Sequence, residues 1–461
     1  MYIQQLYTGC LSEAAYYIES NGEAAIIDPL RETQPYTELA HQRNAKIKYV
    51  FETHFHADFV SGHIDLAAKT GAKIIFGPDA ETAYKVIIAK DNEVFTIGKI
   101  KIKVLHTPGH TLESACYLLL DENDRPHAVF SGDTLFVGDV GRPDLSQKSE
   151  ITQSDLAGMM YESLKKLKNL PDNVILYPAH GAGSACGKNI GKETFSTIGT
   201  QKKVNYALQE MPKEAFIKAI TEGLTPPPNY FFMDAKINMN GYENIDTVLT
   251  KNTQALSVIE FENHIANGAQ ILDVRAADVF ESGFIKNAVN IGLNGQYAPW
   301  VGALIDPNIS IVLVADEGKE KEAVLRLARV GYENVKGYLN GGILAWGKAK
   351  KPLEKINSVD AETFVKTLQE KNNFQIIDVR NAGECETGIV ENAITIPLAE
   401  LSQKIHTLKK KQAYCIYCAG GYRSMMASSI LQKSGFENIT NVRGGMSKIK
   451  LSGIALVQPV V

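Results

Sequence analysis

Short apolar runs separated by polar turns recur through the first 185 residues of the chain. They stand at 24–28, 47–53, 73–76, 102–107, 115–120 and 128–133. Runs of four to eight apolar residues bounded by turn residues are typical of buried strands. Residues 155–170 differ, because their apolar positions recur at helical spacing until Pro171 ends the pattern. The alternation predicts an α/β layered domain in which polar loops follow the strand ends.

A polar, turn-rich stretch at 223–245 follows this domain. Its three consecutive prolines, 226–228, cannot occupy the interior of a regular helix or a central strand. We therefore expect an irregular seam there. We place the first domain at residues 1–235 and a linker at 236–254.

The rest of the chain contains an internal repeat. Segment 271–291 matches segment 376–396, and the related strings "GYENV" and "GFENI" recur at nearly the same offset, 104 to 105 residues. The two copies, at 255–352 and 353–461, each have the size of a small domain. Each runs strand, helix, strand, helix. This order favours a doubly wound parallel sheet with helices on both faces.

Charge and composition exclude several classes of binding partner. The 461 residues include 48 Lys+Arg against 52 Asp+Glu, a net charge of −4, and this balance gives no basic field for nucleic acid or an anionic membrane. The chain shows neither a positively charged leader nor an apolar run of about 18 residues, so we expect a cytoplasmic protein without membrane association. Its six cysteines are too sparse for a disulfide framework and indicate free or reactive thiols.

Histidines and acidic residues follow several of the predicted strands. Four motifs, "THFHAD", "HTPGH", "SGDTLF" and "YPAHG", supply six such residues: His54, His56, Asp58, His110, Asp133 and His180. A single histidine is most often a surface residue or a hydrogen-bonded core residue. An α/β scaffold, however, builds a metal site by bringing ligands from several strand ends to one point. Four motifs in this order therefore indicate metal binding.

The order of these motifs resembles that of the metallo-β-lactamase superfamily, over about residues 1–235. In its dinuclear hydrolases the first motif reads H-x-H-x-D-H, and the last two residues hold the second metal. Here Phe59 stands in place of that final histidine. A phenyl ring offers no lone pair, so we expect one ion instead of two. Two histidines and one carboxylate with open positions are typical of non-haem Fe(II) enzymes that activate oxygen.

Within the superfamily, the motifs look like those of the persulfide dioxygenases. The resemblance implies one Fe(II) per chain, held by three residues and surrounded by three more: His54, His110 and Asp133, then His56, Asp58 and His180. It also implies that a low-molecular-weight thiol persulfide reacts with O2 there to give sulfite. Zinc is the ion that recombinant protein can acquire instead. Cys186 lies in the following loop and is a candidate substrate-contacting thiol, although an inert loop cysteine fits equally well.

In the second copy, a predicted strand leads into the loop "CAGGYR" at 418–423 and then into a helix. Backbone N–H groups and the positive helix end would face the sulfur of Cys418 and favour its thiolate. Gly420 and Gly421 let the loop curl, and Arg423 would anchor an oxyanion such as sulfite or thiosulfate. The C-x4-R loop resembles that of the rhodanese family, which implies that Cys418 carries a persulfide.

Two further features bear on the role of Cys418: the other cysteines of this copy, and the matching loop of the first copy. Cys415 forms a C-x-x-C with Cys418 but lies in the predicted strand, which favours a core position over a redox pair. Cys385 is expected to be a surface thiol. Through the repeat offset, Val314 of the first copy aligns with Cys418. The first copy therefore has no sulfur nucleophile and looks like an inactive rhodanese.

Together the two motif sets predict a persulfide dioxygenase joined to a working sulfurtransferase. The iron domain would make sulfite, and Cys418 would deliver sulfane sulfur to it, giving thiosulfate in sulfide detoxification. Two alternatives stay open: a zinc-dependent thioester hydrolase akin to glyoxalase II, and a non-catalytic sulfur-relay scaffold. The sequence does not determine which thiol carries the persulfide or whether the chain forms a homo-oligomer.

Overall fold

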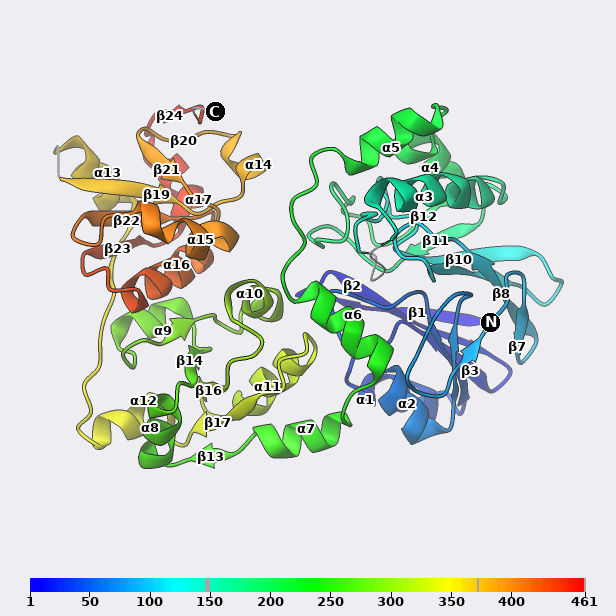
Figure 1. Ribbon diagram of the computed structural model, residues 1–461, viewed down its shortest axis with the longest axis horizontal. Coiled ribbons are helices and arrows are strands. Elements are labelled where there is room, and N and C mark those ends of the chain that lie inside the picture. The colour runs from blue at the N-terminus through cyan, green and yellow to red at the C-terminus, as the bar shows by residue number, and fades with distance from the viewer. Residues whose placement is uncertain (146–149, 371–372, 460–461) are drawn as a thin grey trace. The chain divides into compact units, whose positions relative to one another are not determined.

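The computed structural model describes residues 1–145, 150–370 and 373–459, and the chain divides into two compact units (Figure 1). Unit 1 comprises Met1–Val248 and the short segment Leu327–Tyr332. Unit 2 comprises Leu249–Arg326 and Glu333–Val461, and so contains most of both repeat copies. Among the described residues, no helix combines the length and the apolar character needed to cross a membrane.

Unit 1 contains two six-stranded sheets. Their strand orders are β1-β2-β3-β4-β5-β6 and β12-β11-β10-β9-β8-β7. The first sheet consists of β1 (Tyr2–Thr8), β2 (Glu13–Ser20), β3 (Glu23–Ile27), β4 (Lys46–Glu52), β5 (Lys73–Phe76) and β6 (Ile87–Ile88). The second consists of β7 (Val94–Ile97), β8 (Ile100–His106), β9 (Ala115–Leu120), β10 (Pro126–Gly132), β11 (Ile175–Pro178) and β12 (Ser196–Thr197).

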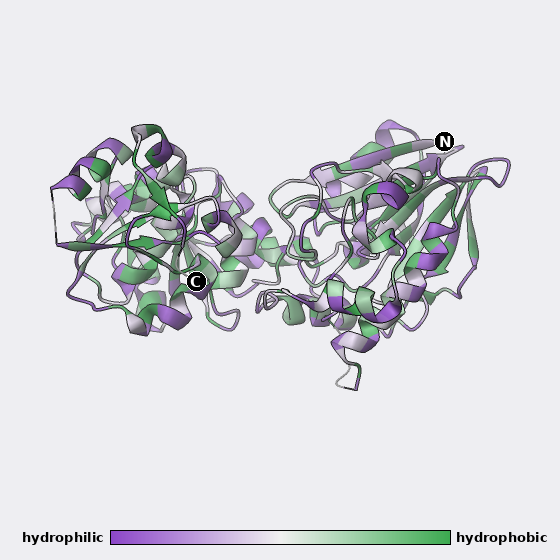
Figure 2. Cartoon of the chain, turned by 90° about the horizontal axis from the view of Figure 1, so that it is seen from above, coloured by the Kyte–Doolittle hydropathy of each residue, from purple (hydrophilic) through white to green (hydrophobic). Residues whose placement is uncertain are grey.

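The inner strands β2, β3 and β9 of unit 1 are buried on both faces, which explains their continuous apolar runs, whereas the edge strands β1 and β7 are only partly buried. In β9, Tyr117 and Leu119 join the core between the two sheets, whereas Cys116 and Leu118 face the helix layer. That layer consists of α3 (Gln153–Lys168), α4 (Ile198–Val204) and α5 (Lys213–Thr221), and α1 (Gln34–Gln42) and α2 (His63–Thr70) cover the first sheet. The result is an αββα sandwich, in which apolar and polar residues alternate along the helices as well as the edge strands (Figure 2). It confirms the predicted fold class.

Most predicted elements of unit 1 form, but the stretch at 223–245 is not irregular throughout. It contains α6 (Phe231–Asn240), which begins three residues after the last proline, with the N–H of Phe231 donating to the carbonyl of Pro228. The prolines restrict only their own positions and the residue before them. The α6 residue Asn238 then donates to the carbonyls of His56 and Phe59, at 2.8 Å each, so this helix holds the first predicted metal loop.

Unit 2 contains two five-stranded sheets with matching orders, β13-β17-β16-β14-β15 and β18-β23-β22-β19-β21, and all their strand pairs are parallel. The first comprises β13 (Ala255–Leu256), β14 (Gln270–Asp273), β15 (Val289–Asn290), β16 (Ile311–Val314) and β17 (Val335–Leu339). The second comprises β18 (Asn357–Val359), β19 (Phe374–Asp378), β21 (Ala393–Thr395), β22 (Ala413–Tyr417) and β23 (Ile439–Val442). The repeated order confirms two doubly wound copies of one domain.

Helices of the two copies correspond as well. Copy 1 has α8 (Val258–Ala266), α9 (Ala277–Ser282), α10 (Tyr297–Leu304), α11 (Glu320–Ala328) and α12 (Gly342–Lys348). Copy 2 has α13 (Ala361–Gln369), α14 (Ala382–Cys385), α15 (Leu401–Lys404), α16 (Tyr422–Lys433) and α17 (Gly445–Ile449). In both copies an aspartate at the end of a strand forms an ion pair with the arginine two residues later. Asp273 pairs with Arg275 and Asp378 with Arg380, each at 2.6 Å.

Candidate metal centre and thiol loop

Four loops of unit 1 carry the residues predicted to bind metal. The loop after β4 brings His54, and the loops after β8, β10 and β11 bring His110, Asp133 and His180. The first of these strands belongs to one sheet and the other three to the opposite sheet. The loops therefore converge at one edge of the sandwich, as the sequence predicted.

The side chains of His54, His110 and Asp133 form the first group. Their ligand atoms all lie within 4.8 Å of one another. The Nε2 atom of His110 lies 3.3 Å from Oδ2 of Asp133, and that of His54 lies 3.9 Å from the same oxygen. Both Nε2 atoms and both Asp133 oxygens are buried without a hydrogen-bond partner. Because buried polar atoms are costly when unsatisfied, this donor set fits a bound cation.

The histidine rings are held so that Nε2 faces the group. In His110, Nδ1 lies 2.8 Å from the carbonyl of Arg142, which can only accept, so Nδ1 carries the hydrogen. In His54, Nδ1 lies 2.9 Å from the hydroxyl of Thr53, and that hydroxyl donates to Asp28 at 2.8 Å. Each Nε2 is thus left with a lone pair. Burial, followed by the neighbouring histidines, lowers the pKa of His54 well below its ordinary value, which keeps the ring neutral.

A second buried group consists of Asp58, His180 and Cys186. The Nε2 atom of His180 lies 3.4 Å from Oδ2 of Asp58 and 3.5 Å from Oδ1 of Asp133, so this group adjoins the first. Burial and then the carboxylates of Asp58 and Asp133 raise the pKa of Cys186 well above its ordinary value. Cys186 is therefore a buried, protonated thiol beside the candidate metal position.

His56 belongs to a third group, with two acids that sequence reasoning missed. Its Nε2 atom lies 3.1 Å from Oδ1 of Asp28 and 3.5 Å from Oε2 of Glu52. These acids come directly after β3 and at the end of β4, a position shared with the predicted ligands. That position was the signal that could have identified them. On its other side, the His56 ring stacks on Phe59, with ring centroids 4.3 Å apart.

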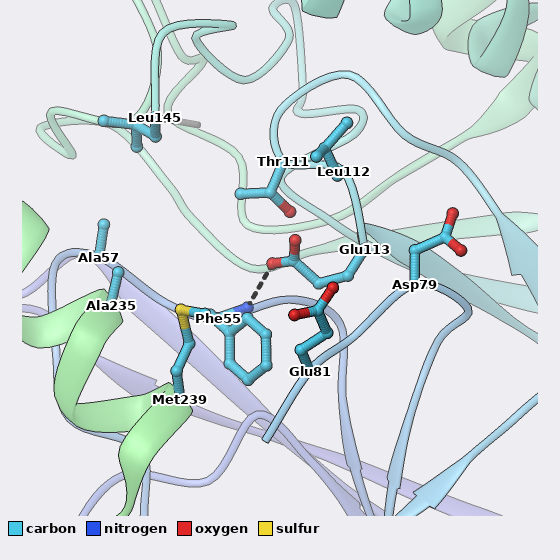
Figure 3. A pocket seen from close by; sticks show the side chains of 10 residues that line it. All are labelled: Phe55, Ala57, Asp79, Glu81, Thr111, Leu112, Glu113, Leu145, Ala235 and Met239. Carbon is cyan, nitrogen blue, oxygen red and sulfur yellow. Dashed lines mark hydrogen bonds between the residues drawn. The ribbon is translucent and has the colours of Figure 1, made fainter. Parts of the chain in front are cut away.

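A pocket lies beside the metal loop (Figure 3). It is lined by Phe55, Ala57, Asp79, Glu81, Thr111, Leu112, Glu113, Leu145, Ala235 and Met239. Phe55 and Ala57 alternate along the loop with the histidines, and Oε1 of Glu113 accepts a 3.0 Å hydrogen bond from the N–H of Phe55. Residues of α6 close one side (Figure 3). The pocket therefore lies next to the residues predicted to hold the ion.

The predicted thiol loop of copy 2 joins β22 to α16. Cys418 is 1% exposed, and its Sγ atom accepts a 3.1 Å hydrogen bond from the N–H of Gly421. Gly421 has a φ of 100°, which disfavours any other residue, whereas Gly420 faces open space. The hydroxyl of Ser424, 3.7 Å from the sulfur, is itself bonded to Asn441 at 2.7 Å. The loop thus curls around the sulfur as the sequence predicted.

Arg423 has a partner that the sequence did not reveal. Its two terminal nitrogens donate to the two carboxylate oxygens of Glu384, at 2.6 and 2.7 Å. These hydrogen bonds lower the pKa of Glu384 below its ordinary value. This pairing is not visible in the sequence because Glu384 lies far from Arg423, in the other half of the copy. The proposed oxyanion anchor is therefore already paired with a carboxylate, and an anion would have to share it.

Two predictions about neighbouring positions need correction. The counterpart of Cys418 in copy 1 is Ala315, not Val314, because Val314 pairs with Asp273 as Tyr417 pairs with Asp378. The offset of the glycines does not hold at this strand, since the copies differ in loop length. Ala315 still offers no thiol. Cys385 is not a surface thiol, since it is 2% exposed and burial raises its pKa to about 11.

Comparison with known proteins supports both halves of this description. A family model of the metallo-beta-lactamase superfamily matches residues 8–180, and a model of the rhodanese-like domain matches 257–349 and 361–452. A crystal structure described as a metallo-beta-lactamase from Staphylococcus aureus is 33% identical, with a TM-score of 0.65, and the match covers 74% of this chain and 98% of that one.

Two curated relatives match the first domain. A hydroxyacylglutathione hydrolase of Prochlorococcus marinus is 35% identical over 167 residues, which are 35% of this chain and 62% of that protein. A probable hydroxyacylglutathione hydrolase of Schizosaccharomyces pombe is 30% identical over 186 residues, 40% of this chain and 68% of that protein. The chain thus spans less than two thirds of the length of the first of these relatives.

Proposed function

The chain belongs to the metallo-beta-lactamase superfamily and carries two rhodanese-like domains, and on this basis we propose that it is a persulfide dioxygenase joined to a sulfurtransferase. The first domain, with one Fe(II), uses O2 to oxidise the outer sulfur of a low-molecular-weight thiol persulfide, and water then cleaves the S–S bond, so that sulfite and the carrier thiol are released. Cys418 then transfers sulfane sulfur to sulfite, giving thiosulfate. Removal of sulfide is the natural purpose of such a pair of activities.

The position of Phe59 supports this proposal most directly. Its ring is fully buried and stacked on His56, and the Nε2 atom of His56 lies against Asp28. The place where dinuclear relatives would supply a second-metal histidine is therefore apolar. Two histidines and one carboxylate remain in the first group, a set that suits a single redox-active ion with open positions.

The residues around the first group orient and shield the reaction. The carbonyl of Arg142 and the hydroxyl of Thr53 hold the two histidine rings in place. We assign the pocket beside the loop to the thiol carrier: it is lined by apolar residues such as Phe55 and Met239, and also by the acids Asp79, Glu81 and Glu113 (Figure 3). A bound Fe(II) would supply the redox chemistry that transfers both atoms of O2 to the outer sulfur.

The thiol loop performs a separate exchange. The thiolate of Cys418 attacks the outer sulfur of a thiol persulfide, a new S–S bond forms, and the carrier thiol leaves. Sulfite then attacks the outer sulfur of the Cys418 persulfide, and thiosulfate leaves with that sulfur while the thiolate is restored. The N–H of Gly421 stabilises the charge on the sulfur in both steps.

A thioester hydrolase is the second candidate for the first domain. The names of the curated relatives favour it, and the group of Asp58, His180 and Cys186 beside the first could contribute ligands to a second ion. Such an enzyme would need two metal ions and a metal-activated water, and it would cleave hydroxyacylglutathione without consuming oxygen. The absence of a histidine at Phe59 counts against it.

One comparison separates the two candidates. Protein prepared without air is analysed for metal and then offered glutathione persulfide or lactoylglutathione in an oxygen electrode cell. We expect about one iron per chain, oxygen uptake with the persulfide, and sulfite as the first product. Two zinc ions per chain, hydrolysis of the thioester and no oxygen uptake would refute the dioxygenase and support the hydrolase.

A further inference from the structure

The helix that follows the thiol loop is packed into the copy that lacks a thiol. Every residue of α16 from Ser424 to Leu431 is buried. Met425 belongs to the same core cluster as Val312, Val314 and Trp346 of copy 1. The hydroxyl of Ser429 accepts a 3.1 Å hydrogen bond from the N–H at position 290, in β15. Helix α16 therefore completes the core of copy 1 as well as that of its own copy (Figure 1).

The first residue of α16 makes the closest of these contacts. The hydroxyl of Tyr422 donates a 2.6 Å hydrogen bond to the carbonyl of Gly292. Its ring lies directly on Gly295, where an added Cβ would stand 2.6 Å from Cζ and 2.7 Å from Cε1. Gly295 does not have a positive φ, so the ring, and not the backbone, is what excludes a side chain there.

Copy 1 keeps the 292–295 loop in place from its own side. Arg326 of α11 donates to the carbonyl of Leu293 at 2.6 Å and to that of Gly295 at 2.9 Å. The seat for the Tyr422 ring is therefore braced by a charge-assisted pair of hydrogen bonds. Copy 1 has no thiol at Ala315, yet it retains a rigid surface under the first turn of α16.

We propose that the copy without a thiol positions the thiol loop of the other copy, through the seat that Gly292 and Gly295 form for Tyr422. Tyr422 stands between Gly421, whose N–H donates to the Cys418 sulfur, and Arg423, which pairs with Glu384. Hydrogen bonds weaken steeply when their angle is distorted, so a displaced Tyr422 misdirects the N–H that faces the sulfur. The inference rests on the proposed function in that it takes Cys418 as the sulfur carrier.

A buried tyrosine could serve packing alone instead of positioning the thiol loop, and a double-mutant cycle separates these two explanations. Gly295→Ala forces the Tyr422 ring to move. In a protein that already carries Tyr422→Ala, the added methyl group has no ring to displace. Gly347→Ala is the matched control, because the same methyl group at this α12 position meets no atom within 4 Å. All variants are made in the full chain.

The readout is the rate at which iodoacetamide alkylates Cys418, followed by mass spectrometry of its peptide across a pH series. We expect Gly295→Ala to slow alkylation about tenfold at neutral pH and to shift its pH profile upward, whereas Gly347→Ala matches the parent. In the Tyr422→Ala background, adding Gly295→Ala changes the rate less than about twofold. We expect the rate of sulfur transfer from thiosulfate to change in the same direction as the alkylation rate in each variant.

Equal effects of Gly295→Ala with and without Tyr422, or a parent-like profile in Gly295→Ala, would overturn the inference. If Gly295→Ala fails to fold, Tyr422→Phe decides, because it keeps the ring and removes only the bond to Gly292; an unchanged alkylation profile then rejects a positioning role. Alkylation reports on the sulfur directly. If the parent protein shows no sulfur transfer, the proposed function is rejected, but the alkylation rates still test the positioning role of Tyr422.

Discussion

The metal group and the thiol loop are built in opposite ways. His54, His110 and Asp133 come from three loops on two sheets, more than 20 residues apart in sequence, and each has atoms left unsatisfied for a ligand. The thiol loop is one run of six residues, 418–423, that follows a strand and enters the first turn of a helix, and its sulfur already has a hydrogen-bond donor. The first site depends on the whole sandwich, whereas the second depends on a local turn and on what braces it.

This difference implies that the two proposed activities can be removed separately. Each site lies in its own compact unit, so we expect a substitution at one site to leave the packing of the other unchanged. A protein with a single shared site, or a scaffold without catalysis, would not behave in this way.

The largest effect is expected from Cys418→Ser. No other thiol lies in the loop, and a serine hydroxyl is neither acidic nor soft enough to carry sulfane sulfur. Sulfur transfer from thiosulfate should be abolished, oxygen uptake with a persulfide should stay at the parent rate, and the product should be sulfite instead of thiosulfate. Loss of oxygen uptake in this variant would show that the thiol loop feeds the metal group, and the two sites would not be separable.

His110→Ala provides the reciprocal test. Removal of one of three ligands should lower metal content and reduce oxygen uptake by at least about 100-fold, since even substitutions around a ligand cost 10–100-fold. Sulfur transfer should remain. Metal analysis and an oxygen electrode measure both outcomes, with the exposed His41→Ala as the control. Unchanged oxygen uptake would remove His110 from the proposed ligand set.

Thr53→Val tests the bracing of the metal group. Valine has the same shape but cannot accept the hydrogen of His54 Nδ1, so metal affinity should fall about 10–100-fold in a competition titration with a chelator. Thr107→Val is the control, because that buried hydroxyl contacts Cys116 and Thr134 and no histidine. Equal affinities in the two variants would mean that the ring is held by packing alone.

The same contrast explains how much the sequence could reveal. The thiol loop was readable because its residues are contiguous, and the predicted ligands were readable because each follows a strand end. Asp28 follows a strand end and Glu52 ends a strand, but neither belongs to a motif, and Asp28 reaches His56 only through the fold. The pairing of Asp378 with Tyr417, which identifies Ala315 as the counterpart of Cys418, exists only in the assembled sheets.

Contacts between distant segments were hidden for the same reason. Three prolines correctly predicted a break in regular structure, but α6 forms shortly after them, and its Asn238 amide donates to two carbonyls of the metal loop, a contact that the sequence does not reveal. Tyr422 lies in the predicted loop 418–423, and no motif in the sequence indicates that Gly295 lies under its ring. Local propensity predicts elements, and such tertiary partners are set by packing.

The smallest expected effect comes from Glu384→Gln, which tests how completely the loop is prearranged. Arg423 lowers the pKa of Glu384, so the carboxylate contributes stability above about pH 4.5 and loses it as the pH falls through the lowered value. The pair is partly exposed, so the variant should lose less than about 1 kcal/mol at pH 7. That difference, measured by thermal unfolding of parent and variant, should shrink below pH 4.5.

The kinetics of sulfur transfer provide a second test of Glu384→Gln. A neutral glutamine releases part of the Arg423 charge for an incoming oxyanion, so the KM for thiosulfate should fall a few-fold with little change in kcat. Glu386→Gln, at an exposed position two residues on, should alter neither value. A raised KM in Glu384→Gln would instead mean that the carboxylate holds Arg423 in its binding position. The thiol loop would then depend on a distant partner as strongly as the metal group does.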